Sequence, residues 1–444
     1  MSDLFIIGAS GTKAYRSAMA AISENISNAS TPGFARRSVT TAESGASTAT
    51  MATYVTNANF GGTQVKSVDR ATDPYLDSTV RSTGMALGSA SARLRWLSDA
   101  ETALNDTGTG IGKLMAGMYQ NMEKLAASPS DKSLRVTTID SIGRVTQAFN
   151  QTAADLKTVS AGIATEARSS VESVNASLSA LADINNSLLR AQPGTSAYAQ
   201  LLDSRDSALA DITENLNVTI GFGAHDSAEI SYGGQTLVSG NKAAGVSVSA
   251  NADGTLAFSL SDGTALSAPG SGKLGGYASA ASTVANRRND LDTLAAQFVS
   301  DLNGWHGQGR TDAGAGGGAL VSGTDAATLA TLITDPADLA TRSADGRLNG
   351  NLLNVTSVLR GNGSVEQGWT GIITAHANLL ASTKAESDTA TSRNDQAVAA
   401  REAVSGVDLD MEAADLLRIQ QAYSASAKII QVAKDVVDSI LRIS

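Results

Sequence analysis

The stretch NISNASTPGFARR, residues 25–37, decides the fold because it ends one kind of structure and begins another. Before it, small or apolar residues recur every three or four positions, a spacing that places them on one face of a helix. Within it, Pro32 biases Thr31 away from helical angles, and Gly33 favours a turn. We therefore predict a helix that stops before Gly33, after which Phe34 and two arginines begin the next segment.

Both ends of the chain carry apolar stripes with helical spacing. The N-terminal stripe consists of Leu4, Gly8, Gly11, Tyr15, Ala18, Ile22, Ile26 and Ala29. In the C-terminal stretch, residues seven apart and those between them follow the heptad pattern of a coiled coil, namely Leu409, Leu416, Tyr423, Ile430 and Val437 with Ile419, Ala433 and Ile440. Two alternatives stay open. The stripes close a pair within one chain, or they pair only in an assembly, because glycine and alanine bury little area.

The middle of the chain predicts a mainly α fold with a small β insert. Helical spacing recurs from about residue 74 to 215, and alternating apolar and polar residues follow at 217–268. A helix resumes at about Val284 and stops at the glycine run GRTDAGAGGG. We expect a terminal coiled-coil domain of residues 1–35 and 406–444, a helical bundle domain with an extended linker of residues 36–216 and 273–405, and a small outer β domain of residues 217–272.

Composition argues against several classes of function. The 444 residues carry a formal net charge of -10 and no basic block longer than an arginine pair, so we expect no nucleic-acid partner. There are no cysteines, and the three histidines lack neighbours at metal-ligand spacing, so we expect no metal. No run of about 18 apolar residues and no cleaved leader is recognisable. Composition alone favours a cytosolic protein, and an exported one would need a route without a cleaved leader.

Motifs of catalysis and ligand binding are weak. The sequence contains no H-E-x-x-H, no G-x-S-x-G and no phosphate-binding loop. The segment GSGKL at 270–274 departs from such a loop, because Ser267 replaces its first glycine and Leu274 replaces its magnesium-binding hydroxyl. We therefore predict no enzyme and no cofactor.

Charged clusters are better explained by helix structure than by a site. Asp408, Asp410 and Glu412 lack the glycine of a calcium loop and fit helix capping and complementation of the helix dipole. We predict that Asp203, Arg205 and Asp206 form ion pairs on a helix surface, and that His306, beside the glycine run, is solvated.

The two ends of the chain resemble a known family. NISNASTPGFARR is similar to the N-terminal signature of bacterial flagellar rod, hook and hook-associated proteins, and SGVDLDMEAADLLRIQQAYSASAKIIQVAKDVVDSIL at 405–441 is similar to their C-terminal signature. The interior segments LLDSRD, RRNDLDTLAAQFVSDLNGWHGQG and ADGRLNGNLLNV resemble the FlgK family of hook-associated proteins. Departures are modest: Glu24 stands where asparagine is common, Phe34 stands where tyrosine is usual, and the β insert is short.

The resemblance implies a structural adaptor that joins hook to filament. Implied partners are other copies in a ring or tube, the hook protein, the second hook-filament junction protein and a flagellar export chaperone, with no nucleic acid and no membrane. The implied location is extracellular, on the flagellum, after type III export without a cleaved signal peptide. Phe34, Arg36 and Arg37 would then begin a segment that lies between subunits.

Other functions remain open at this point. The chain could be another axial subunit, such as a hook or distal rod protein, or a secreted carbohydrate-binding or adhesive module. For the adaptor, the candidate assembly interface consists of Leu4, Tyr15, Ile22, Ile26, Asn28, Pro32, Gly33, Phe34, Leu409, Leu416, Ile419, Tyr423, Ile430, Val437 and Ile440.

Overall fold

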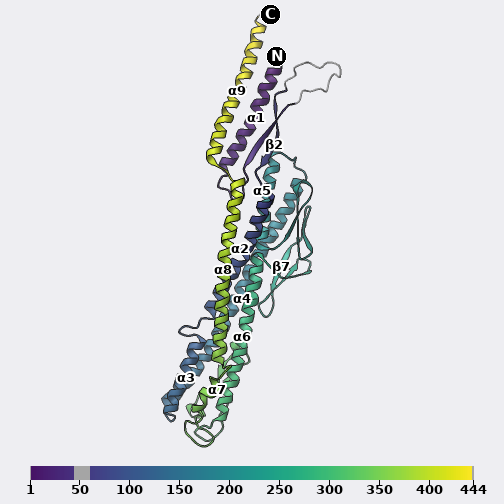
Figure 1. The fold of residues 1–444 in the computed structure, drawn as a ribbon. Helices are drawn as coiled ribbons and strands as arrows, with labels where there is room; N and C mark the ends of the chain where they lie inside the picture. Colours follow the sequence, from purple (N-terminus) through teal and green to yellow (C-terminus); the bar gives the residue numbers. More distant parts are fainter. Residues whose placement is uncertain (1, 45–60, 443–444) are drawn as a thin grey trace. The chain divides into compact units, whose positions relative to one another are not determined.

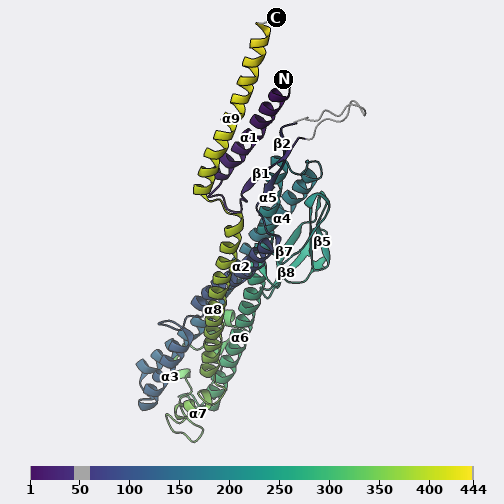
Figure 2. The same cartoon turned by 45° about the horizontal axis from the view of Figure 1, so that its top comes forward.

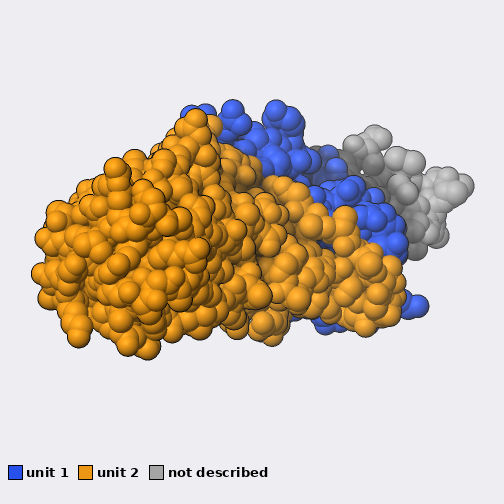
Figure 3. All heavy atoms as spheres, turned by 90° about the horizontal axis from the view of Figure 1, so that it is seen from below, with its two compact units in different colours: residues 1–85, 173–245, 391–444 blue, residues 86–172, 246–390 orange. Residues whose placement is uncertain are grey.

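The computed structural model describes residues 2–44 and 61–442, and it confirms a mainly α fold with small sheets (Figure 1). The chain forms two compact units, which Figure 3 colours separately. The first comprises Met1–Met85, Ser173–Gly245 and Thr391–Ser444, and the second comprises Ala86–Glu172 and Val246–Ala390. Three long helices contribute residues to both units: α2 (Pro74–Ala103), α4 (Lys132–Leu188) and α8 (Val365–Ser405).

The first unit starts with a helix followed by a β hairpin. Helix α1 (Ser2–Ser27) stops within the predicted stretch, and Gly33 has φ +80°, a left-handed angle that glycine adopts without steric cost. The chain then forms β1 (Arg37–Glu43), which pairs antiparallel with β2 (Thr63–Arg70). The predicted helix stop is therefore confirmed, and the segment after it is a strand.

Helix caps and one buried amide position the rest of this unit. Asp408 precedes α9 (Leu409–Leu441), and its Oδ1 accepts hydrogen bonds from the backbone N–H groups of Asp410 and Met411. On α4, the buried Asn185 donates to the carbonyl groups of Ala228 and Gly240. Asn185 thereby holds α4 against a four-stranded antiparallel sheet. This sheet and the helix before it are α5 (Ser196–Asn215), β3 (Thr219–Phe222), β4 (Ala228–Tyr232), β5 (Gln235–Ser239) and β6 (Lys242–Ala243).

The second unit contains most of the large buried side chains. Trp305, Trp369 and Phe149 are almost fully buried, and the Phe149 and Phe298 ring centroids lie 5.7 Å apart. Its helices are α3 (Ile111–Ala127), α6 (Gly272–Gln308) and α7 (Val355–Leu359). Its strands are β7 (Val246–Ala250), β8 (Leu256–Leu260), β9 (Ala265–Leu266), β10 (Val321–Ser322) and β11 (Ala330–Thr331).

The predicted start of α6 is wrong by about three turns. The helix begins at Gly272 rather than at about Val284, and Gly276 in its first turns serves helix packing. A Cβ atom added at Gly276 would collide with the Ser89 carbonyl oxygen of α2. Gly276 therefore lets the two helices approach closely.

The prediction that His306 is solvated is also wrong, because only 2% of the residue is exposed. Its Nδ1 donates to the Gly318 carbonyl oxygen at 2.6 Å, and its Nε2 accepts from the Ala340 N–H at 2.8 Å. The imidazole is therefore neutral, and burial lowers the pKa of His306 below its ordinary value. His306 fixes the glycine run at the end of α6 to the segment that contains Ala340.

Candidate assembly site

The terminal helices α1 and α9 lie side by side and antiparallel (Figures 1 and 2). Small residues allow this close approach. A Cβ atom added at Gly8 would lie 2.6 Å from Ile430 Cγ1, and one added at Gly11 would lie 2.7 Å from Ser426 Oγ. Of the two alternatives left open by the sequence, the structure therefore shows the pair within one chain.

The residues predicted for the assembly interface fall into two sets. One set is buried or half-buried and consists of Tyr15, Ile22, Asn28, Phe34, Leu416, Ile419, Tyr423, Ile430 and Val437. The other set is exposed and consists of Leu4, Ile26, Pro32, Gly33, Leu409 and Ile440. In an isolated chain, another molecule could contact the residues of the exposed set.

A group of buried polar side chains lies where α1 meets α9 and β1. Asn25 is fully buried; its Nδ2 donates to the Arg37 carbonyl at 2.8 Å and to Glu412 Oε2 at 3.1 Å, and its Oδ1 accepts from the Arg37 N–H at 2.8 Å. Glu412 is equally buried, and its Oε1 lies 2.6 Å from Arg36 Nε. We call Asn25, Arg36 and Glu412 the polar lock. Asp408 is the cap of α9, and Glu412 lies in the first turn, where an acidic side chain complements the helix dipole; its carboxylate also binds this lock.

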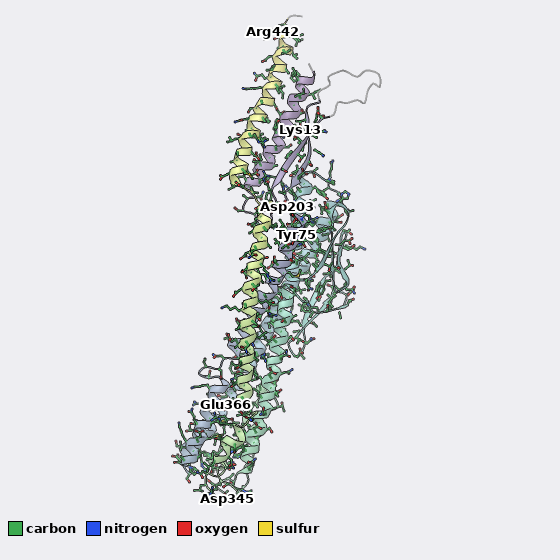
Figure 4. All side chains as sticks on the ribbon, viewed as in Figure 1. Lys13, Tyr75, Asp203, Asp345, Glu366 and Arg442 are labelled. Carbon is green, nitrogen blue, oxygen red and sulfur yellow. The ribbon has the colours of Figure 1, made fainter. Side chains whose placement is uncertain are left out.

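A second ionic group ties the hairpin to α5. Arg37 and Arg70 are register partners in the two strands, and both guanidinium groups are buried. Asp203 of α5, which is labelled in Figure 4, lies 2.6 Å from Arg37 Nη2 and 2.7 Å from Arg70 Nη2. Arg70 also pairs with Asp206 at 2.8 Å, and Arg37 pairs with Glu24.

These contacts bear on two predictions made from the sequence. The predicted ion pairs of Asp203, Arg205 and Asp206 are confirmed, since Asp206 also lies 2.6 Å from Arg205 Nη2. The expectation that Phe34, Arg36 and Arg37 begin a segment that lies between subunits stays a prediction. Both guanidinium groups bind carboxylates of the same chain.

The hairpin covers a further side of α1. Ser10 Oγ accepts from the Thr63 N–H at 3.1 Å, and a Cβ atom added at Gly62 would lie 3.1 Å from the Ile7 Cα. Helix α1 is thus flanked by α9 and by β2. This leaves α9 as the terminal helix with the larger free surface.

The free surface of α9 carries an apolar stripe that the sequence analysis missed. Val432 is 56% exposed, and its neighbours on the same face follow at helical spacing. We call this set the outer stripe; it consists of Met411, Ala414, Ala425, Ile429, Val432 and Val436. The heptad analysis assigned only the face of α9 that packs against α1. Apolar residues that follow each other at steps of three and four on another face of α9 indicate a second apolar stripe.

Other candidate sites do not form binding centres. Most of GSGKL lies in the first turn of α6 rather than in a loop that could surround a phosphate. Over residues 2–44 and 61–442, no three histidine or acidic side chains gather closely enough to hold a metal ion. None of the helices in the described part of the chain has the length and apolarity of a membrane span.

Family models match three parts of the chain. The model described as "Flagellar hook-associated protein FlgK helical domain" matches residues 97–321, which is just over half of the chain. The model described as "Flagella basal body rod protein" matches residues 6–34, and "Flagellar basal body rod FlgEFG protein C-terminal" matches residues 402–443. The two latter matches coincide with α1 and its turn, and with α9.

Whole-chain comparisons agree with these matches. The chain is 25% identical to the flagellar hook-associated protein 1 of Bacillus subtilis, over 96% of this chain and 95% of the relative. It is 24% identical to the protein of that name in Salmonella typhimurium, over 70% of this chain and 57% of the relative. The fold is similar to that of the flagellar hook junction protein FlgK from Burkholderia pseudomallei, with a TM-score of 0.65, 14% identity, and coverage of 75% of this chain and 100% of that structure.

Proposed function

Because the chain belongs to the flagellar hook-associated protein FlgK family, we propose that it is the structural subunit that joins the flagellar hook to the filament. It acts by packing, and we assign it no catalytic role. The matches to rod-protein models at both ends support an axial position in the flagellum. The match of the interior to the FlgK helical domain supports the junction in particular.

The single observation that carries this proposal is the exposed outer stripe of α9. The apolar residues from Ala425 to Val436 are uninterrupted on this face, whereas Arg418 and Gln421 separate them from Met411 and Ala414. An exposed apolar patch on a folded chain marks a site of contact with another protein. The stripe lies on one of the two terminal helices, beside the seam between α1 and α9. A second copy of this chain could cover the stripe with its own terminal helices, and repetition of that contact would build a ring or tube. The exposed Ile440 follows Val436 at helical spacing and would extend the same surface.

The proposed partners follow from this position. Besides other copies of itself, the subunit would contact the hook protein on one side and the second hook-filament junction protein on the other. An export chaperone would bind near α9 before secretion and keep the outer stripe covered. The chain would then be exported through the flagellar channel to the outside of the cell, without a cleaved signal peptide.

Two alternatives are separated from the junction role by simple observations. A hook or distal rod subunit would be located by labelled antibody along the hook or inside the rod, whereas a junction subunit would be found in a band between hook and filament. A carbohydrate-binding module would depend on the strands at 219–266. Deletion of residues 219–270 would remove binding in that case, while an adaptor without them would still assemble.

The substitution Val432→Asp tests the proposed function. A charge on the outer stripe is harmless in a single chain, because a solvent-exposed substitution changes the free energy of unfolding by about 0.5 kcal/mol or less. In the assembly the same carboxylate would be buried against apolar surface, so we expect at least a roughly tenfold loss of attached filaments. Filaments are counted by electron microscopy in cells that produce only the variant.

Gln431→Asp is the matched control, since it adds the same charge at an exposed adjacent position on the polar face of α9. It should leave filament attachment near the wild-type level. Equal melting temperatures of the purified variants would show that both fold. Normal filament attachment with Val432→Asp would contradict the proposal.

A further inference from the structure

We propose that the polar lock formed by Asn25, Arg36 and Glu412 sets the register in which α9 pairs with α1. The lock acts within a single chain, and its consequence for assembly rests on the function proposed above. The other contacts between α1 and α9 fit more than one alignment of the two helices. Asn25 and Glu412 select one of these alignments, so they are positioning residues.

The geometry of the lock is specific to one alignment. Asn25 uses its amide on three partners at once: the Arg37 carbonyl, the Arg37 N–H and Glu412 Oε2. Glu412 divides its two carboxylate oxygens between Asn25 and Arg36. With both side chains fully buried, water cannot replace a partner that is lost. Removing one partner would therefore leave an uncompensated buried polar or charged group.

The remaining contacts between α1 and α9 do not select this alignment. Gly11 lies against Ser426, and Asn25 lies against Glu412, so these two contacts of the seam are fourteen residues apart on each helix. This equal spacing of two heptads makes a shift by one heptad geometrically possible. In the shifted pair Gly11 would lie against Ala433, another small residue that fits the same close approach.

Along the seam between α1 and α9, the shift fails at the lock. It would place Ile419 against Asn25, where an apolar side chain cannot accept the Nδ2 hydrogen bond. It would also remove Glu412 from Arg36 and from the donor that satisfies its second oxygen. A shift in the opposite direction is blocked by size, because Gly11 would face Ile419. The alignment is therefore decided by the position of one carboxylate, as a buried polar group decides register in coiled coils.

The register also determines at what height along α1 the outward-facing residues of α9 lie. A one-heptad shift moves α9 by about 10 Å along the seam, since an α-helix rises about 1.5 Å per residue. Neighbouring copies would then meet the outer stripe in the wrong place. In this way two buried side chains would control a surface that neither of them touches.

Disulfide trapping in the purified monomer tests the register directly, because the chain has no cysteine of its own. One pair, Gly11→Cys with Ser426→Cys, reports the native alignment; a Cβ atom at Gly11 would lie 3.2 Å from Ser426 Cβ. A second pair, Gly11→Cys with Ala433→Cys, reports the shifted alignment. Each pair is placed in the wild-type background, in Glu412→Leu and in Glu412→Gln, and the oxidation rates are compared.

We expect the native pair to oxidise much faster than the shifted pair in the wild-type background. In Glu412→Leu the ratio of the two rates should fall by at least about tenfold, because an apolar residue fits either alignment. Glu412→Gln retains an acceptor for Asn25 and should give an intermediate ratio. Glu24→Gln, which removes a half-buried neighbouring charge, should leave the ratio unchanged.

Two results would overturn the proposal. One is an unchanged ratio in Glu412→Leu, with circular dichroism showing the helix content retained. The other is loss of both disulfides in that variant, since the carboxylate would then hold the helices together rather than select their alignment. These experiments use monomers, so failure of the register proposal is distinguishable from failure of the junction function, which is measured by filament attachment.

Discussion

Removing Asp203 should release the β hairpin from α5. The Asp203 carboxylate pairs with both Arg37 and Arg70, whose side chains are only 5% and 7% exposed. Loss of one partner from a buried charge pair costs about 3–5 kcal/mol. Arg37 keeps Glu24 and Arg70 keeps Asp206, so we take the lower end, about 3 kcal/mol, for Asp203→Ala. That is about a hundredfold increase in the population of the opened hairpin.

Trypsin gives a local measurement of this opening, because it cleaves after arginine. Cleavage of a protected bond follows the population of the opened form when opening and closing are fast. We therefore expect the bonds after Arg37 and Arg70 to be cut about a hundredfold faster in Asp203→Ala than in the wild-type chain. Mass spectrometry of the early fragments identifies the cleaved bonds.

Ser204→Ala is the control, since Ser204 is exposed and adjacent on α5. It should not alter cleavage at either arginine. If Asp203→Ala also leaves both bonds as protected as in the wild-type chain, the ion pairs do not hold the hairpin, and the reasoning about buried charges at this place is refuted.

Three further predictions concern other parts of the chain. Burial lowers the pKa of His306 and His376, so their contribution to stability is complete above about pH 6.5 and is lost as the pH falls toward their folded values, which melting curves at pH 7.5 and 5.5 would detect. Tyr423→Asp should weaken the α1–α9 pair by about 1–3 kcal/mol, and the exposed Lys434→Ala should have little effect, as measured by hydrogen exchange in α9. Asn185→Ala leaves buried backbone groups unpaired and should destabilise β4 by about 1–3 kcal/mol, with faster exchange there.

Local sequence rules predicted the terminal helices well. The stop after Ser27 follows from Pro32 and Gly33, and the start of α9 follows from Asp408, because a proline, a glycine or a cap acts on backbone only a few residues away. The heptad positions from Leu416 to Val437 were found for the same reason. Their half-buried state matches the α1-facing side that the periodicity predicted.

The polar lock could not be predicted by these rules. Glu412 and Ser426 occupy the same heptad row as Ile419 and Ala433, yet an apolar pattern search passes over polar members. The partner of Glu412 on α1 is 387 residues away in the sequence, so no local window contains both. Asn25 appeared only as part of a turn-forming segment.

Glycine was interpreted wrongly where its role is packing. A glycine in a turn and a glycine between two close helices look the same in the sequence. Only the backbone that surrounds each glycine in the fold distinguishes the two roles. Gly276 faces the α2 backbone, so the segment before Tyr277 is helical although its composition favours a loop. The distant contact outweighs the low helix propensity of glycine.

The distance along the chain between Asn25 and Glu412 also determines when the contact between α1 and α9 can form during synthesis and folding. A ribosome delivers α1 long before α9, so α1 must wait, unpaired on its α9 side, until residues 409–441 have been made. Contacts between such distant segments form late in folding, because a very long loop has to close first. Incomplete chains therefore never acquire the seam, and only a finished molecule can offer the surface by which it would be joined to its neighbours.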